Sequence, residues 1–319
     1  MNKFAKQLLP FSSLLFIISL WTFLEPDTFL TFQNFKNVLS STAANGIIAA
    51  GMTFVIITAG IDLSVGSMLT FLCCVCAKIM MGTDNGLLGI FGTIGIGAVC
   101  GLVNGVLVSY VKLNSFITTL GTSSIFTALA LRLSSGTVLV IPDNCDPLFQ
   151  AVGISSFGPI HILIVWFVII AIVLGLLLSR TVFGQQLYTI GSNPVAARFS
   201  GIRAKKNTTV AYILTGICVG FAAVLMMANV KSSNPQAASG KEMEIILMVV
   251  LGGVSVTGGK GSVWGTIIGV LFYGVMSSGL THMNLSQYLQ WTIMGTIMII
   301  ALSMDVLKER GVTLWKKQK

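Results

Sequence analysis

Charged side chains are scarce in this chain, and acidic ones are the scarcest of all. Asp, Glu, Lys and Arg make up 9% of the 319 residues, against about 25% in soluble domains. Hydrophobic residues make up 54%, and the mean hydropathy is +0.90. A soluble fold of this size could not solvate such a surface. The composition therefore predicts an all-α polytopic membrane protein that forms one domain over residues 1–319, with membrane lipid around it.

Two functional classes lack their usual sequence features. The net charge is +9, but the basic residues stand at the ends of apolar segments instead of forming one solvated basic face, so no nucleic-acid partner is expected. The chain also has no Gly-x-x-x-x-Gly-Lys-(Ser/Thr) sequence, in which backbone amides would hold the phosphates of a nucleotide. If nucleotide drives this protein, a separate chain must bind it.

Clusters of reactive side chains are missing too. Five of the six cysteines lie inside apolar segments, and Cys145 has no obvious disulfide partner. The pair Cys74 and Cys76 has no His or carboxylate beside it, so small buried apolar residues are the better interpretation. His161 and His282 are isolated at loop edges. We therefore expect no catalytic residue, no metal site and no cofactor bound by this chain.

Long apolar segments fill the rest of the sequence. A membrane-crossing helix needs about 20 apolar residues. We predict about ten spans, at 8–24, 38–59, 67–82, 87–110, 115–133, 160–179, 208–229, 243–257, 263–281 and 288–307. The third and eighth are short, and each flanks a glycine-rich turn, so broken or re-entrant helices are expected there.

The distribution of Lys and Arg sets the orientation. With ten spans and a cytoplasmic N-terminus, 14 of the 19 Lys and Arg fall on the cytoplasmic side. The opposite orientation would reverse the usual excess of positive charge inside. We expect a multi-pass protein of the bacterial cytoplasmic (inner) membrane with both termini in the cytoplasm.

Two glycine-rich turns resemble each other. Gly60 to Ser67 reads GIDLSVGS and Gly253 to Ser262 reads GVSVTGGKGS, each after an aliphatic run. Glycine-interrupted segments at matching positions of a weak internal repeat are typical of transporters. The predicted topology places both turns on one membrane side and relates the halves by an axis along the membrane normal.

Six polar or glycine positions near these turns and spans are candidates for a solute path or gate: Asn45, Asp62, Ser64, Asn104, Gly253 and Ser255. For Asp62 the competing interpretation is ordinary turn chemistry, in which the carboxylate caps backbone amides. Asn45 and Asn104 either face solute or bond to neighbouring helices.

The polar loop 180–207 predicts a short exposed helix. Asn193 is a suitable N-cap, Pro194 fits the first turn and Gly201 can end the helix. Ala196 and Ala197 are small, and Arg198 and Phe199 are free for contact. The pattern alone leaves two roles open, which are docking into a partner's groove and resting on lipid headgroups.

Three blocks of this sequence, the turn at Gly60–Ser67, the loop Gly191–Ile202 and the segment Val250–Gly261, stand in the order and spacing of a known family. They resemble the permeases of ribose-type ABC sugar importers, a group that handles ribose, xylose, arabinose and autoinducer-2. The likeness extends from about Phe29 to Asp305. Two departures are Pro194, where relatives usually carry an acidic or neutral residue, and Lys241, where an aromatic residue is usual.

The resemblance implies the partners of such a permease. An ABC ATP-binding subunit, which holds ATP and Mg²⁺, would dock on a coupling helix. A periplasmic or lipid-anchored sugar-binding protein would deliver the solute. A second permease copy or a sister permease would complete the membrane part. The coupling helix maps onto Asn193, Pro194, Ala196, Ala197, Arg198, Phe199, Ser200 and Gly201.

The leading expectation is therefore the membrane subunit of an ATP-driven importer for a sugar or sugar-like solute, without enzymatic activity of its own. The alternative is an autonomous secondary carrier, which would need buried acidic residues for ion coupling, and the spans hold almost none. A membrane-embedded enzyme would need clustered His, Asp or Cys side chains.

Overall fold

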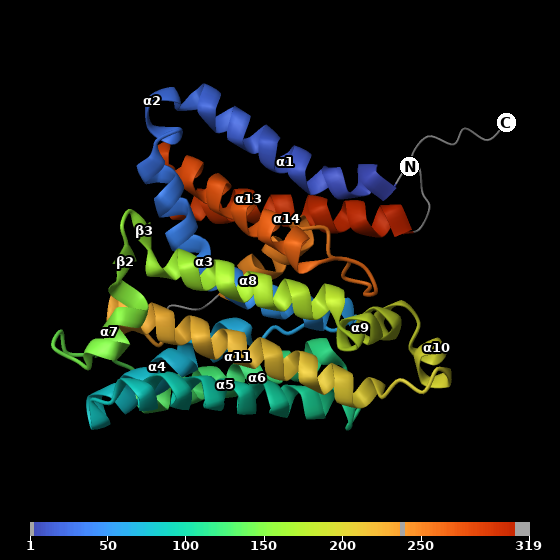
Figure 1. Cartoon of the computed structure of the whole chain (residues 1–319), viewed down its shortest axis with the longest axis horizontal. Coiled ribbons are helices and arrows are strands. Elements are labelled where there is room, and N and C mark those ends of the chain that lie inside the picture. The colour runs from blue at the N-terminus through green and yellow to red at the C-terminus, as the bar shows by residue number, and fades with distance from the viewer. Residues whose placement is uncertain (1–2, 237–239, 310–319) are drawn as a thin grey trace.

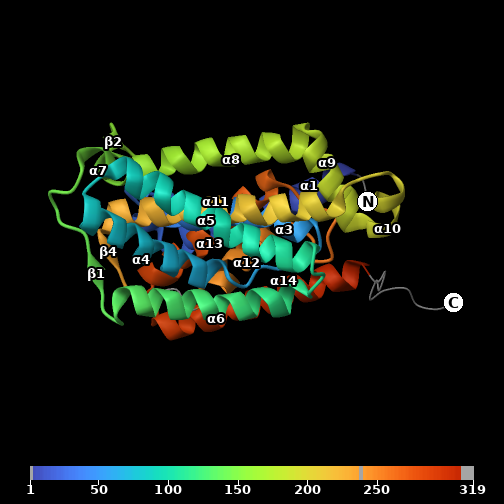
Figure 2. The same ribbon diagram turned by 90° about the horizontal axis from the view of Figure 1, so that it is seen from below.

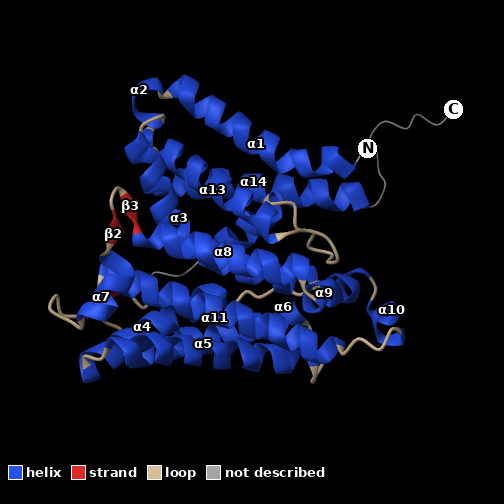
Figure 3. Ribbon diagram, in the orientation of Figure 1, coloured by secondary structure: helices blue, strands red, loops and turns tan. Residues whose placement is uncertain are grey.

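The structure is a computed structural model that describes residues 3–236 and 240–309. Helices dominate these residues (Figure 3). Their bounds are α1 Lys3–Leu24, α2 Pro26–Phe29, α3 Phe32–Ile57, α4 Val65–Thr83, α5 Gly86–Ser109, α6 Ser115–Ser134, α7 Pro147–Ile154, α8 Ile162–Arg180, α9 Val182–Ser192, α10 Pro194–Phe199, α11 Ala204–Val230, α12 Lys241–Leu251, α13 Val263–His282 and α14 Gln287–Glu309.

Four two-residue strands accompany them: β1 Leu139–Val140, β2 Ser156–Phe157, β3 Ile160–His161 and β4 Ser232–Ser233. β1 pairs antiparallel with β4, with Leu139 opposite Ser233, and β2 pairs antiparallel with β3. The β1–β4 ladder joins the long loop between α6 and α8 to the segment that follows α11, and the β2–β3 ladder is a hairpin within that loop.

The long helices lie roughly along the long axis of the molecule, which therefore has two distinct ends (Figure 1). We call them the α7 end, where α2, α7 and the strands lie, and the α10 end, where α9 and α10 lie. Helix α1 begins and α14 ends at the α10 end. Seen from below, α8 covers one face of the molecule, and α6 and α14 lie along the opposite face (Figure 2).

The core forms around α3, α4 and α11. Every residue of α3 from Gly46 to Ile57 is buried, as expected for a helix that is apolar all round. Hydroxyl groups tie the central helices together: Thr53 Oγ1 lies 2.7 Å from Thr266 Oγ1 of α13, and Thr215 of α11 donates to the Gly51 carbonyl at 3.1 Å.

Glycine residues allow the backbones of α5 and α11 to approach each other closely. A Cβ added at Gly101 would meet the carbonyl oxygen of Tyr212, and one added at Gly216 would meet that of Gly97. Backbones of membrane helices approach this closely only where side chains are absent.

The prediction of about ten spans is not confirmed as ten long helices. Among the described residues, seven helices are long and apolar enough to cross a membrane: α3, α4, α5, α6, α8, α11 and α13. The other three predicted spans correspond to α1, whose apolar part is Phe11–Leu24, to α12 and to α14.

The expectation of broken helices beside the glycine turns was half right. Helix α4 is continuous over 19 residues and qualifies as a full span, so the third span is not short. Helix α12 has only 11 residues. It ends because four glycines between Gly253 and Gly261 adopt positive φ, which no helix accommodates.

Candidate functional site

The two glycine-rich turns meet at the α10 end of the molecule. The backbone amide of Gly259 donates to the carbonyl of Ile57, the last residue of α3, at 2.8 Å. Gly258 lies against Ala59, and its φ of +87° excludes a side chain there without strain. The segment after α12 therefore rests directly on the turn between α3 and α4.

Helix α9 attaches the polar loop to the same place. The hydroxyl of Tyr188 donates to the Gly261 carbonyl at 2.7 Å. The α carbon of Gly191 approaches the Ile57 carbonyl so closely that a Cβ would collide with it. All three sequence blocks that carry the family resemblance thus lie together in space.

Helix α10 begins and ends as the sequence predicts. The Asn193 side chain accepts hydrogen bonds from the amides of Val195 at 3.0 Å and Ala196 at 2.9 Å. Gly201 follows the helix with a φ of +72°, the left-handed conformation that commonly ends a helix.

The exposed face of α10 is narrower than the sequence suggests. Phe199 is 88% exposed and Val195 64% exposed, and Pro194, Ala196, Arg198 and Ser200 are exposed as well. Ala197 is fully buried against its own chain. It therefore supports the helix from beneath, and the surface open to a partner is formed by its neighbours.

Three candidate residues form one buried network, in which Asn104 joins Asp62 and Ser64 from a distant part of the sequence. In the turn between α3 and α4, Asp62 Oδ1 accepts from the Ser64 amide at 2.9 Å and from Ser64 Oγ at 2.6 Å. Asn104 of α5 donates from Nδ2 to Ser64 Oγ at 2.8 Å. The capping role predicted for Asp62 is confirmed, and Asn104 bonds across helices.

Around this network three buried polar atoms have no partner among the described residues: Asp62 Oδ2, Asn104 Oδ1 and Tyr212 Oη. All three side chains are fully buried. Burial raises the pKa of the Asp62 carboxyl above its usual range, although the Ser64 hydrogen bonds oppose the shift. Tyr212 was not predicted, because nothing in its local sequence distinguishes it from a core aromatic residue.

Two further candidates, Gly253 and Ser255, lie in the second turn. Gly253 has a φ of +81°, and Ser255 Oγ lies 3.0 Å from Thr257 Oγ1. The Ser255 amide donates to the Lys260 carbonyl at 3.1 Å, which closes the loop on itself. These two residues shape the turn at the α10 end.

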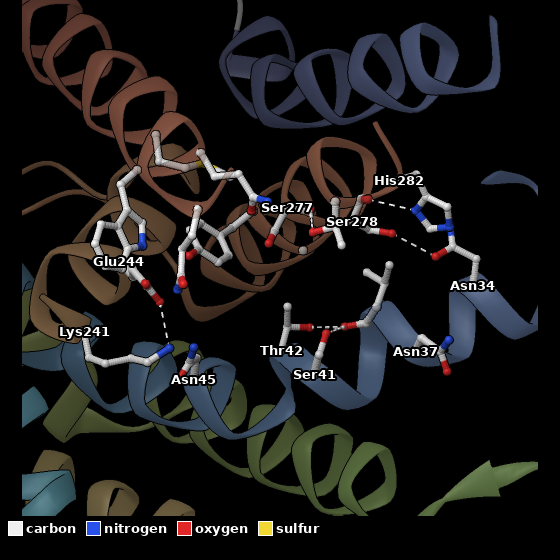
Figure 4. Close-up of a pocket in the computed structure, with 18 residues that line it drawn as sticks. Asn34, Asn37, Ser41, Thr42, Asn45, Lys241, Glu244, Ser277, Ser278 and His282 are labelled. Carbon is white, nitrogen blue, oxygen red and sulfur yellow. Dashed lines mark hydrogen bonds and ion pairs between the residues drawn. The ribbon is translucent and has the colours of Figure 1, made fainter. Parts of the chain in front are cut away.

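A cavity of about 470 Å³ opens near the α7 end, at the opposite end of the molecule from these turns (Figure 4). It lies between the beginnings of α3, α12 and α14 and the end of α13. Of the six candidate path residues only Asn45 lines it, and Figure 4 shows Asn45 beside Lys241.

Most of the residues that line the cavity are polar. Lys241 and Glu244 form an ion pair at 3.1 Å. Ser278 donates to Asn34 Oδ1 at 2.8 Å, and His282 Nδ1 lies 2.9 Å from the Ser278 carbonyl. The Ser278–Asn34 bond holds the beginning of α3 to the end of α13 beside the opening.

The spacing of polar residues in α3 indicates part of this cavity wall from the sequence alone. Asn34, Asn37, Ser41 and Asn45 recur at intervals of three and four residues, the spacing of one face of a helix. A polar stripe on an otherwise apolar span predicts a wetted surface. The residues that α12, α13 and α14 contribute show no comparable pattern.

No group of three or more His, Cys, Asp or Glu side chains in described positions could hold a metal ion.

Comparisons with known proteins agree on one family. Residues 34–302 match the family described as "Branched-chain amino acid transport system / permease component". The ribose import permease RbsC of Bacillus subtilis (strain 168) is 37% identical over 297 residues, which cover 93% of this chain and 91% of that protein. No solved structure matches the chain.

Two further relatives carry other sugar names. The D-allose transport system permease AlsC of Escherichia coli (strain K12) is 34% identical over 92% of this chain and 90% of its own length. The L-arabinose ABC transporter permease AraH of Azospirillum brasilense is 35% identical over 88% of this chain and 81% of its own length.

Proposed function

This chain belongs to the family of transport-system permease components, and we propose that it is the membrane-spanning subunit of an ATP-driven ABC importer for a sugar. The sugar-named relatives, each similar over most of both chains, support the substrate class. The observation that carries the proposal is the junction of an exposed, capped helix α10 with both glycine turns. Nothing in the comparisons supports an autonomous carrier.

A separate ATP-binding subunit supplies the energy and holds ATP and Mg²⁺. It docks on α10, whose exposed Val195, Arg198 and Phe199 offer one cation flanked by apolar groups. A short helix presented to a partner's groove fits this use. Its N-cap keeps the first turn formed before docking, so less ordering entropy is lost on binding.

Movement of α10 passes to the membrane-spanning helices through hydrogen bonds at the α10 end. Tyr188 of α9 holds the Gly261 carbonyl, and Gly259 holds the end of α3 through the Ile57 carbonyl. When the ATP-binding subunit draws α10 sideways, the turns at the bases of α3, α4 and α13 move with it. That motion alternates the access of the solute between the two membrane sides.

The orientation follows from the same assignment. The α10 end faces the cytoplasm, together with both termini, and the α7 end faces outward. A periplasmic or lipid-anchored sugar-binding protein delivers solute at the α7 end. A second permease copy or a sister permease completes the pathway, and lipid covers the exposed apolar sides of α5 and α8.

Substitution of the exposed aromatic residue of α10 tests the proposal. We expect Phe199→Asp to abolish co-purification of the ATP-binding subunit from native membranes in mild detergent and to stop ATP-dependent sugar uptake. The matched control is Lys206→Ala, which changes the charge by the same amount at an exposed position of α11. A chain that takes up sugar without any ATP-binding subunit would refute the proposal.

A further inference from the structure

The cavity near the α7 end has the size of a ligand pocket. Its volume of about 470 Å³ falls within the roughly 300–1,000 Å³ of typical small-molecule sites. It is built by α3 together with α12, α13 and α14, so a solute held there would contact an early helix and the last three helices of the described chain.

The wall offers hydrogen bonds that the protein leaves unused. The side chains of Asn45, Ser277 and Gln287 line the cavity and make no hydrogen bond to any residue that the structure describes. Asn45 and Ser277 come from different helices, α3 and α13, and both are labelled at the cavity in Figure 4. A solute rich in hydroxyl groups can both donate to and accept from amide and hydroxyl side chains.

Aromatic surface complements these groups. Trp291 of α14 and Tyr273 of α13 line the same cavity. Each combines a flat apolar ring with a polar tip. Such a ring can cover the C–H face of a sugar while the amides and hydroxyls bond its edge.

The charged side chains of the cavity are unsuited to binding a zwitterionic solute such as an amino acid. Its two charged lining residues, Lys241 and Glu244, neutralise each other at 3.1 Å. A branched-chain amino acid would need one free partner for each of its charged groups and an apolar pocket for its side chain. It would also leave the wall amides of Asn45 and Gln287 without the hydrogen-bond partners that a hydroxyl-rich solute offers.

We propose that this cavity, lined by Asn45, Ser277, Gln287, Tyr273 and Trp291, binds a neutral polyhydroxylated solute, so that the permease itself selects sugars and rejects branched-chain amino acids. The proposal rests on the importer function above. It places part of the selectivity in this chain, in addition to any selection by a delivering protein.

The experiment uses the complete importer in proteoliposomes, with its ATP-binding subunit and its binding protein. Uptake of labelled D-ribose, D-allose, L-arabinose, D-galactose and L-leucine is measured together with ATP hydrolysis. For wild type we expect uptake of at least one sugar and none of leucine. Asn45→Leu and the milder Ser277→Ala should lower kcat/KM for that sugar by about fivefold to tenfold, the effect of one lost hydrogen bond.

The same variants should change the order of the four sugars when they are ranked by kcat/KM for uptake. The binding protein should still stimulate ATP hydrolysis in these variants. A merely structural defect would lower both activities without changing the ranking. The control is Thr292→Val on α14. Thr292 is exposed, bonds only to the Tyr288 carbonyl of its own helix and lies outside the cavity wall, so uptake should stay at the wild-type rate.

Unchanged rates and an unchanged ranking in both cavity variants would overturn the proposal. So would leucine uptake by a wild-type importer that carries none of the four sugars; that result would leave an ATP-driven importer in place but would remove sugar as its substrate. The importer function itself fails in a different way, through the absence of a bound ATP-binding subunit in the α10 experiment.

Discussion

Asp62 shows how much one side chain can depend on a neighbour that is distant in sequence. Its Oδ1 accepts hydrogen bonds from Ser64, whereas its Oδ2, like Asn104 Oδ1 and the Tyr212 hydroxyl, is buried without a partner among the described residues. An ionised carboxylate in this place is costly because no described cation balances it. The group contributes local instability at a turn that must move.

We therefore expect Asp62→Asn to stabilise the fold above neutral pH. The raised pKa of Asp62 means that the folded state binds more protons than the unfolded one, so wild-type stability falls as pH rises above about 4 toward the folded-state pKa. Asn carries no charge to bury and can donate to the Asn104 carbonyl oxygen.

The melting temperature of the detergent-purified protein, measured at pH 4.5 and pH 8, checks this expectation. At pH 8 the melting temperature of the variant should exceed that of the wild type, by an amount that corresponds to about 1–3 kcal/mol for relieving an unsatisfied buried group. At pH 4.5 the increase in melting temperature should be smaller. An equal or larger gain at pH 4.5 would show that ionisation of Asp62 is not the cause.

At the scale of elements, the pairing of α5 with α11 decides how the core closes. Gly97, Gly101 and Gly105 recur every four residues on α5, and each lies against the backbone of α11. This spacing gives α5 one face without side chains, and that face contacts the backbone of α11. The close approach also sets Asn104 and Tyr212, which lie on these two helices, beside the Asp62 turn.

We expect Gly101→Leu to separate the two helices. The new side chain would collide with the Tyr212 carbonyl, and overpacking of this kind costs about 1–3 kcal/mol or more. Thermal unfolding should occur at a lower temperature, and sugar uptake should fall with it. Gly95→Leu on the same helix is the matched control, because nothing lies within 4 Å of a Cβ added there. Equal losses in both variants would mean that glycine content, rather than close packing, matters.

On the scale of the whole molecule, the two ends have different chemistry. The α10 end joins the glycine turns to an exposed helix, whereas the α7 end carries the small β ladders, the Lys231–Asp143 ion pair and the polar cavity. This asymmetry suits an importer that meets a delivering protein on one side and an ATP-binding subunit on the other.

Cysteine labelling tests the orientation of these ends. The six native cysteines are all buried, so wild-type protein should react little with a membrane-impermeant maleimide. In intact cells we expect Ser156→Cys at the α7 end to be labelled and Ser200→Cys at the α10 end to be protected. Both residues are exposed. Inverted membrane vesicles should give the opposite result, and labelling of Ser200→Cys in intact cells would reverse the proposed orientation.

The sequence alone determined those features that depend on neighbouring residues. Apolar length located the membrane helices, although it overestimated how many would be long. Side-chain capping fixed the start of α10 at Asn193, and the positive φ preferred by glycine shaped the turn from Gly253 to Gly261. These are local effects, because a cap or a turn involves residues only a few positions apart.

Only the tertiary structure decided which of these features meet. Asp62, Asn104 and Tyr212 come from three segments, and the cavity takes its wall from α3, α12, α13 and α14. Ala197, expected on the docking surface, is buried, while Asn45 lines the cavity far from the other path candidates. Which helix faces meet depends on close backbone packing between helices. Hydropathy scores each segment by itself, so it carries no information about which helix will pack against it.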